Sequence, residues 1–259
     1  MTLHHATVMY GDLPLTLSEA GKGRPVLLLH GGGGPRTVAG LAEHLSRSAH
    51  TIAPTHPGWN GTPRPDWLAG IDDLALLYLR MLHERGLTDV LVIGSSMGGW
   101  TAAEMAALDT TGIVTGLILI NAVGVRIEGA PITDFFALDA RAAAEHTLHD
   151  PDRFKADLAS LSADQVAVQQ ANMATVRAIA ADPYMYDPKL LHRLPRIEVP
   201  TLVLWGESDR IVTPAYGAAY AEAFGNARFE LIAEAGHLPQ IEQPEATFAL
   251  IDAHLHGEE

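Results

Sequence analysis

Short apolar runs alternate along this chain with longer segments in which hydrophobic residues recur at helical spacing. Near-continuous apolar runs are typical of strands buried on both faces of a sheet. The predicted strands lie at residues 13–17, 25–30, 50–54, 89–94, 117–121, 200–206 and 228–232. The predicted helices lie at residues 37–48, 71–82, 97–108, 214–224 and 244–255. This alternation predicts an α/β fold with a mostly parallel central sheet and helices on both faces.

A central stretch, residues 123–196, departs from this alternation. It is rich in alanine, has no strand pattern, and carries prolines that divide it into short predicted helices. These prolines are Pro131, Pro151, Pro183, Pro188 and Pro195. We therefore predict a core formed by residues 1–123 and 196–259, with a helical cap inserted at residues 124–195.

Composition narrows the classes of protein that fit. Hydrophobic residues make up 47% of the 259 residues, which is enough to bury a sizeable core. The formal net charge of −14 disfavours binding to nucleic acids and to anionic membranes, because both carry negative charge. The absence of cysteine excludes disulfides, thiolate metal sites and a cysteine nucleophile.

The sequence carries no pattern of a targeting or membrane segment. Its first residues lack the basic start and apolar run of a secretory leader. Its apolar runs are far shorter than the roughly 20 residues that cross a bilayer. We expect a cytoplasmic protein that acts on a small-molecule substrate, with no nucleic-acid or membrane partner, and a homodimer is left open.

The most specific motif is Gly94-Ser95-Ser96-Met97-Gly98, a G-x-S-x-G pattern where a predicted strand ends and a predicted helix begins. A serine at the centre of such a turn presents its hydroxyl at the carboxyl edge of the sheet. Glycine is needed on either side because a side chain there would collide with the neighbouring strand or helix. We therefore predict that Ser96 is a nucleophile.

A serine hydroxyl needs a base, and the base needs an acid that orients it. His237 follows the last predicted strand and Asp209 follows the strand before it, so both lie where open α/β sheets place their sites. The order Ser96, Asp209, His237 is the order expected for this motif. Glu207 is a rival acid, whereas Asn121, after another strand, cannot carry the negative charge.

Four consecutive glycines at residues 31–34 follow another predicted strand. Glycines let backbone N–H groups approach a ligand closely. In acyl transfer, negative charge develops on the former carbonyl oxygen, and N–H donors aimed at that oxygen stabilise it by about 3 kcal/mol each. We predict the N–H of Met97 as one donor and the N–H of Gly32 or Gly33 as the other. A phosphate-binding loop is disfavoured because no G-K-[ST] follows.

Together these motifs resemble the α/β-hydrolase superfamily over nearly the full length of the chain. The resemblance rests on a glycine-rich oxyanion loop after His30, a nucleophile elbow, an acid, a late histidine and a helical cap. It implies the α/β-hydrolase fold and no cofactor, with Ser96 as nucleophile, Asp209 as orienting acid and His237 as base. It also implies a structural role for His30.

A second, non-catalytic turn of the family has a counterpart at residues 55–62 of this chain. The segment is similar to the family pattern D-x-P-G-x-G-x-S, but Thr55 replaces the acid and Thr62 replaces the serine. We therefore expect different hydrogen bonds to hold this turn.

The residues beside the nucleophile separate the members of the superfamily. Dehalogenases and epoxide hydrolases have aspartate at the elbow, so Ser96 excludes them. The S-M-G-G sequence resembles hydrolases that cleave carbon–carbon bonds in meta-cleavage products, but Ser95 and Leu238 stand where those enzymes usually have asparagine and tryptophan. We expect a serine-dependent hydrolase of a small carboxylic ester or related acyl substrate, acting through an acyl-enzyme intermediate. The alternatives are a carbon–carbon bond hydrolase of diketone acids and a non-enzymatic ligand receptor on this fold.

The predicted cap supplies the remaining candidate residues. Apolar residues expected to line the substrate pocket are Phe135, Phe136, Tyr184 and Met185, with Met173, Val176, Ile179 and Tyr186 as further candidates. A carboxylate substrate of the carbon–carbon type would need a cation, for which the cap-side candidates are Arg126, Arg177 and Arg193. No metal site is predicted, because His146 and His149 lack further ligands.

Overall fold

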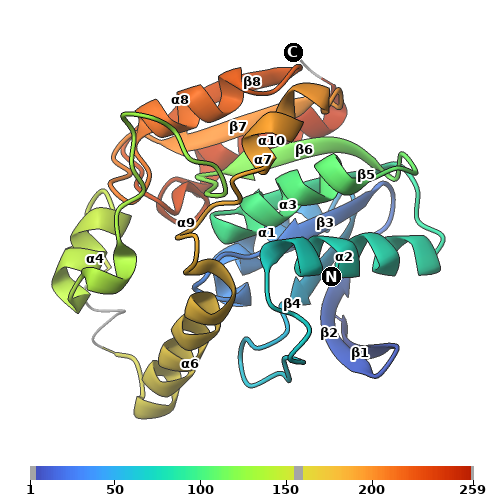
Figure 1. Ribbon diagram of the computed structural model, residues 1–259, viewed down its shortest axis with the longest axis horizontal. Helices are drawn as coiled ribbons and strands as arrows, with labels where there is room; N and C mark the ends of the chain where they lie inside the picture. Colours follow the sequence, from blue (N-terminus) through green and yellow to red (C-terminus); the bar gives the residue numbers. More distant parts are fainter. Residues whose placement is uncertain (1–3, 155–159, 258–259) are drawn as a thin grey trace.

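An eight-stranded sheet forms the centre of the computed structural model, which describes residues 4–154 and 160–257 (Figure 1). The strands lie in the order β1-β2-β4-β3-β5-β6-β7-β8. Their bounds are β1 His4–Tyr10, β2 Leu13–Ala20, β3 Pro25–Leu29, β4 His50–Thr55, β5 Val90–Ser95, β6 Val114–Ile120, β7 Thr201–Gly206 and β8 Ala227–Ile232. Strands β3 to β8 pair in parallel, whereas β2 is antiparallel to both β1 and β4. The predicted mostly parallel α/β fold is confirmed.

Helices cover both faces of this sheet, because the side chains of each strand alternate between two hydrophobic clusters. Val26 and Leu28 of β3 belong to the cluster beneath α1 (Ala39–Leu45) and α10 (Pro244–His256). Leu27 and Leu29 belong to the cluster on the opposite face. That face is covered by α2 Ile71–Glu84, α3 Met97–Leu108 and α8 Pro214–Glu222.

The edge strand β1 is the one strand of the described sheet that the sequence pattern does not predict. Five of its seven residues are exposed and only Tyr10 is buried, so it shows neither an apolar run nor a clear alternation of apolar and polar residues. Gly11, with a φ of 64°, turns the chain so that β2 pairs back along β1. An exposed edge strand therefore escapes a prediction based on burial patterns.

Residues 121–200, called the helical segment below, connect β6 to its neighbour β7. The described helices of this segment are η2 Phe135–Ala137, α4 Ala140–Thr147, α6 Ala163–Ala180, α7 Leu190–Arg193 and η3 Leu194–Arg196. As predicted, none of its described residues joins the sheet. The expectation of short helices is wrong for α6, which has 18 residues because no proline interrupts it. In Figure 1, α4 and α6 stand apart from the sheet, and the predicted cap boundaries at residues 124 and 195 stay a prediction.

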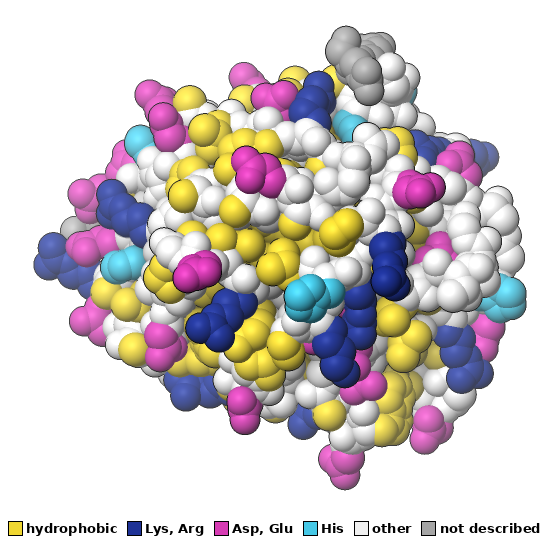
Figure 2. Space-filling model, turned by 45° about the horizontal axis from the view of Figure 1, so that its top comes forward, with side chains coloured by type: hydrophobic (Ala, Val, Ile, Leu, Met, Phe, Trp, Pro, Cys, Tyr) yellow, Lys and Arg dark blue, Asp and Glu magenta, His cyan; other side chains and the backbone are white. Residues whose placement is uncertain are grey.

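Acidic side chains are spread over the molecular face shown in Figure 2, with basic and hydrophobic side chains between them. Large exposed hydrophobic residues such as Met9, Trp67 and Leu231 come from distant parts of the chain, and scattered residues of this kind are normal on a surface. Among the described helices, none combines the length and the apolar character needed to cross a bilayer.

Candidate active site

Ser96 occupies the sharp turn between β5 and α3. Its φ of 56° lies in the left-handed region, which is unusual for a residue with a side chain and is typical of strained functional positions. A side chain on Gly94 would overlap the carbonyl oxygen of Gly98, and one on Gly98 would overlap that of Leu29. The two glycines therefore permit the strand, the turn and the helix to pack this closely.

The structure brings Ser96, His237 and Asp209 into one hydrogen-bonded row. The hydroxyl oxygen of Ser96 lies 2.9 Å from His237 Nε2, and His237 Nδ1 lies 2.7 Å from Asp209 Oδ2. Because a carboxylate can only accept, Nδ1 carries the hydrogen and Nε2 is left to accept from the serine. The rival acid Glu207 is exposed, whereas Asp209 is buried.

Four donors hold the Asp209 carboxylate in place. The backbone N–H groups of Ile211 and Val212 donate to Oδ1 at 2.8 and 3.1 Å. Oδ2 accepts from His237 and, at 2.6 Å, from the side-chain amide of Asn121. A carboxylate with this many donors is held in one orientation.

Asn121 is a functional candidate that the sequence reasoning missed. It directly follows β6, is fully buried, and also accepts the N–H of Gly206 at 3.2 Å. As a candidate acid Asn121 is excluded, because an amide cannot supply the negative charge. Its position at the carboxyl end of a central strand could have identified it, because an amide at that edge of the sheet can donate to the acid.

The glycine loop after β3 lies against the serine. A side chain on Gly31 would come within 2.9 Å of the Ser96 Cβ atom, so the loop approaches the nucleophile through its backbone. Gly32 and Gly33 line the same cavity as Ser96 and Met97. Met97 is the first residue of α3, where N–H groups have no acceptor within the helix. The three candidate residues for the two predicted oxyanion donors therefore line one space beside Ser96.

Two buried histidines support this loop. The backbone N–H of His56 donates to His30 Nε2 at 3.0 Å. His30 therefore carries its hydrogen on Nδ1, which donates to the Gly31 carbonyl at 2.7 Å. His56 Nε2 in turn donates to the His30 carbonyl, and its Nδ1 accepts from the Tyr78 hydroxyl at 2.6 Å. Burial lowers the pKa of His56 to about 4 and holds the pKa of His30 well below its usual value. Both rings are therefore neutral and structural.

Thr62 holds the turn at residues 55–62. Its hydroxyl donates to the Trp59 carbonyl at 2.8 Å and accepts the N–H of Gly58 at 3.1 Å. The Trp59 ring N–H then donates to the Gly32 carbonyl at 2.9 Å. The turn is therefore held together by the Thr62 hydroxyl, and through Trp59 it also holds the glycine loop in place.

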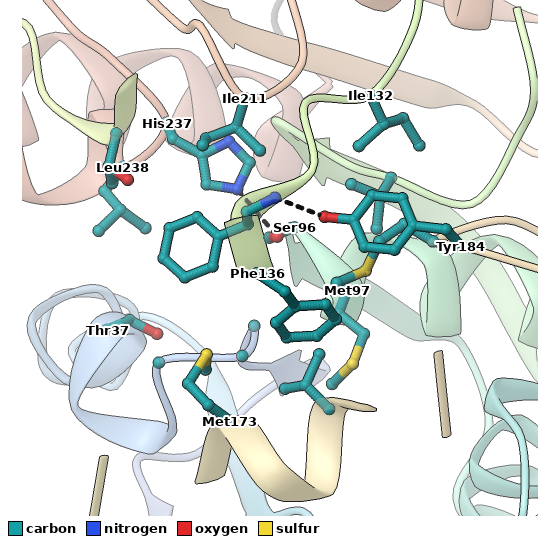
Figure 3. A pocket seen from close by; sticks show the side chains of 18 residues that line it. Thr37, Ser96, Met97, Ile132, Phe136, Met173, Tyr184, Ile211, His237 and Leu238 are labelled. Atoms are coloured by element: carbon teal, nitrogen blue, oxygen red, sulfur yellow. Dashed lines mark hydrogen bonds between the residues drawn. The ribbon is translucent and has the colours of Figure 1, made fainter. Parts of the chain in front are cut away.

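A cavity of about 180 Å³ opens beside Ser96 (Figure 3). All four residues predicted for the pocket, Phe135, Phe136, Tyr184 and Met185, lie in its lining. Met173 and Val176 of α6 line it as well, whereas Ile179 and Tyr186 do not, so the expectation for those two is wrong. The lining also includes residues that were not predicted for the pocket, namely Thr37, Val123, Ile132, Thr147, Ile211 and Leu238.

No Lys, Arg, Asp or Glu of the described chain lines this cavity. Arg193 is paired with Glu104 at 3.1 Å and with Asp187 at 3.4 Å. The guanidinium of Arg177 lies over the Phe136 ring, 4.2 Å from its centre, and Arg126 lines a different surface hollow. The three arginines proposed to meet a substrate carboxylate therefore lie outside the cavity lining.

The two histidines near the end of α4 serve local contacts. The helix ends at Thr147, so His149 does not share a helical face with His146. His146 Nδ1 donates to the Ala142 carbonyl, and His149 Nδ1 lies 2.7 Å from the Ser208 hydroxyl. Within residues 4–154 and 160–257, no group of three or more His, Asp or Glu side chains is placed to hold a metal ion.

Known proteins of similar sequence include hydrolases. A relative from Metapseudomonas resinovorans, a 2-hydroxy-6-oxo-6-(2'-aminophenyl)hexa-2,4-dienoic acid hydrolase, is 29% identical over 91% of this chain and 85% of its own length. Lipase 3 of a Moraxella species is 24% identical over 85% of this chain and 73% of its own.

Solved structures share the fold. A serine hydrolase from the polyaromatic hydrocarbon-degrading bacterium Cycloclasticus zankles superposes with a TM-score of 0.83, at 19% identity and 99% coverage of both chains. A thermophilic esterase from Thermogutta terrifontis superposes with a TM-score of 0.75, at 23% identity, covering 100% of this chain and 99% of its own. The sequence profile of the Alpha/beta hydrolase family matches residues 26–250, and the chain belongs to that family.

Proposed function

We propose that this protein is a serine esterase that hydrolyses small, uncharged carboxylic esters through an acyl-enzyme intermediate. The observation that carries the proposal is the row of Ser96, His237 and Asp209, of which Ser96 and His237 line an apolar cavity. The row supplies a nucleophile with its base, and the cavity supplies an environment in which an apolar acyl group is favoured over a charged one.

The chemistry follows from the positions of the atoms. Ser96 Oγ attacks the ester carbonyl carbon while His237 Nε2 takes its proton, and the carbonyl oxygen becomes an oxyanion that accepts from Met97 and from Gly32 or Gly33. When the tetrahedral intermediate collapses, His237 returns the proton to the leaving alkoxide and an acyl-serine remains. A water molecule, deprotonated by His237, then releases the acid and restores the serine. Asp209 orients the ring throughout.

The size and lining of the cavity narrow the substrate class. A space of about 180 Å³ is small for a ligand site. A substrate carboxylate placed among these side chains would lose its hydration without gaining a cation, and burying an unpaired charge is strongly unfavourable. These features favour a short, neutral acyl group.

A carbon–carbon bond hydrolase is the second candidate, because the relative from Metapseudomonas resinovorans carries a name of that kind. Its substrate is a dienoic acid, which brings a carboxylate to the site. The absence of a cation from the described lining weighs against that reaction in this chain.

The two candidates are separated by steady-state kinetics on p-nitrophenyl butyrate and on a 2-hydroxy-6-oxo-hexadienoate. We expect kcat/KM for the ester to exceed that for the dienoate by at least about 100-fold, since an unpaired buried charge disfavours binding by several kcal/mol. Ser96→Ala is the matched control and should abolish turnover of either substrate. A higher kcat/KM for the dienoate would overturn the proposal, and no turnover of either by folded protein would favour a receptor.

A further inference from the structure

The end of helix α4 packs against the two loops that carry the acid and the base. The last carbonyls of a helix have no donor within the helix and need other partners. Here the carbonyl of His146 accepts the N–H of Arg210 at 3.1 Å, next to Asp209. The carbonyl of Thr147 accepts the backbone N–H of His237 at 2.6 Å. The helical segment therefore contacts the backbone of both loops directly.

Glu242, in the short helix α9 (Pro239–Glu242), joins the same two parts of the chain through its side chain. Its Oε2 accepts the backbone N–H of Gly236 at 2.6 Å, and its Oε1 accepts the backbone N–H of His149 at 2.7 Å. The residue is only 2% exposed. Gly236 adjoins His237 and His149 lies two residues after Thr147, so one carboxylate binds both segments that meet at this contact. This arrangement is called the clamp below.

We propose that Glu242 is a positioning residue, which holds the His237 loop against the end of α4 and thereby keeps the His237 ring between Ser96 and Asp209. The inference rests on the proposed function, because it takes His237 as the base. It assigns a mechanistic task to a buried acid that touches none of the three side chains of the row.

Gly236 shows how close this contact is. A side chain at Gly236 would overlap the Thr147 carbonyl and come within 2.9 Å of the Leu148 Cα atom. Only glycine therefore lets the His237 loop reach the end of α4. The two backbones are therefore in direct van der Waals contact at this point.

The chemistry of the clamp requires a carboxylate. Both partners are backbone donors, and a carboxylate offers an acceptor at each of its two oxygens. In Glu242→Gln the amide oxygen can accept one N–H, but the NH₂ group then faces the other. That variant keeps the size of the side chain and leaves one buried N–H without an acceptor.

The test compares Glu242→Gln with Glu245→Gln, an exposed glutamate three residues further along the chain. We expect Glu242→Gln to lower kcat for p-nitrophenyl butyrate by about 100-fold, the loss typical of a displacement of about 1 Å in a reacting group. KM should stay nearly unchanged, because the cavity lining does not include Glu242. Glu245→Gln should match the wild type. A Glu242→Gln enzyme with wild-type kcat, or a loss confined to KM, would overturn the proposal.

A measurement on the wild type keeps the proposal testable if the variant does not fold. Amide hydrogen exchange followed by NMR reports the opening of single N–H groups. If Glu242 clamps the contact, the N–H groups of His149, Gly236 and His237 open together, with protection factors within about threefold of one another. Protection of His237 that is independent of the other two would contradict the clamp. This readout does not depend on ester hydrolysis, so failure of the proposed function and failure of the clamp remain distinguishable.

Discussion

Asn121 donates its side-chain N–H to Oδ2 of Asp209 at 2.6 Å, the same oxygen that accepts from His237 Nδ1. Two donors converge on one oxygen, and the amide follows β6 whereas the acid follows β7. The acid is thereby fixed from β6 as well as from its own loop.

This relationship predicts the effect of removing the amide. Asn121→Ala should lower kcat/KM for a short ester by about 10- to 100-fold, because a buried hydrogen bond to a charged group contributes about 1.5–3 kcal/mol. Asn226→Ala removes an exposed asparagine from the sequence before β8 and should leave kcat/KM unchanged. Unchanged kcat/KM in the folded Asn121→Ala variant would show that the amide does not support the acid.

The choice of acid gives a second prediction. Asp209→Asn should lower kcat by about 10⁴-fold while the fold is kept, because the amide cannot hold the His237 ring in the required tautomer. Glu207→Gln should stay within about twofold of the wild type, since that side chain is exposed and lies outside the row. A reversed order of the two effects in the same ester assay would show that the acid is assigned incorrectly.

The position of Met173 leads to a prediction about the acyl chain length that the cavity accepts. Its terminal methyl lies 3.2 Å from the position that a Cβ atom on Gly32 would take, so this side chain fills space next to the oxyanion loop. Met173→Ala should shift the preferred ester towards acyl chains about three heavy atoms longer, the length of the side chain removed. A panel of p-nitrophenyl esters measures the shift. Val166→Ala, at an exposed position of the same helix, is the control; an identical chain-length profile for both variants would contradict the assigned cavity.

The raised pKa of the buried Glu104 carboxyl leads to a prediction about how the stability of the protein depends on pH. Burial, followed by the charge of Asp187, raises its pKa to about 7 despite the contact with Arg193. The folded state then binds a proton more tightly than the unfolded state, so the free energy of unfolding falls as pH rises from about 4.5 to about 7.

Glu104→Gln should remove this dependence, because a neutral amide does not titrate. Relative to the wild type, the variant should gain about 3 kcal/mol in unfolding free energy between pH 4.5 and pH 8. Denaturant unfolding at several pH values measures the difference. A constant difference between the two proteins across that range would show that folding does not shift the pKa of Glu104.

The sequence was most informative where local patterns decide the structure. The pattern around Ser96 predicted a strand followed by a helix at residues 97–108, and α3 has those bounds. The continuous burial of β5 and the two elbow glycines leave little choice there. In contrast, β1 was missed because its residues are mostly exposed. Short helices were expected throughout the stretch that holds α6, although no proline falls within its 18 residues.

The parts of the site that escaped prediction depend on contacts between distant residues. Asn121 and Asp209 are 88 positions apart, and His149 and Glu242 are 93 positions apart. The sequence around Glu242 does not indicate that its carboxylate accepts a backbone N–H just after helix α4. The partners of such side chains are set by the tertiary fold, which a single sequence does not display.

The central claim is that Ser96 is an activated nucleophile, and covalent labelling tests it most directly. Folded protein is treated with a fluorophosphonate, the intact mass is measured, and the modified residue is located by peptide mapping. We expect one adduct per chain, on Ser96, with loss of fluoride, because the Ser96 hydroxyl donates to His237. Ser95→Ala removes the buried neighbouring serine and should label as the wild type does, whereas Ser96→Ala should not label. Folded wild-type protein that stays unlabelled, or an adduct that persists in Ser96→Ala, would contradict the account.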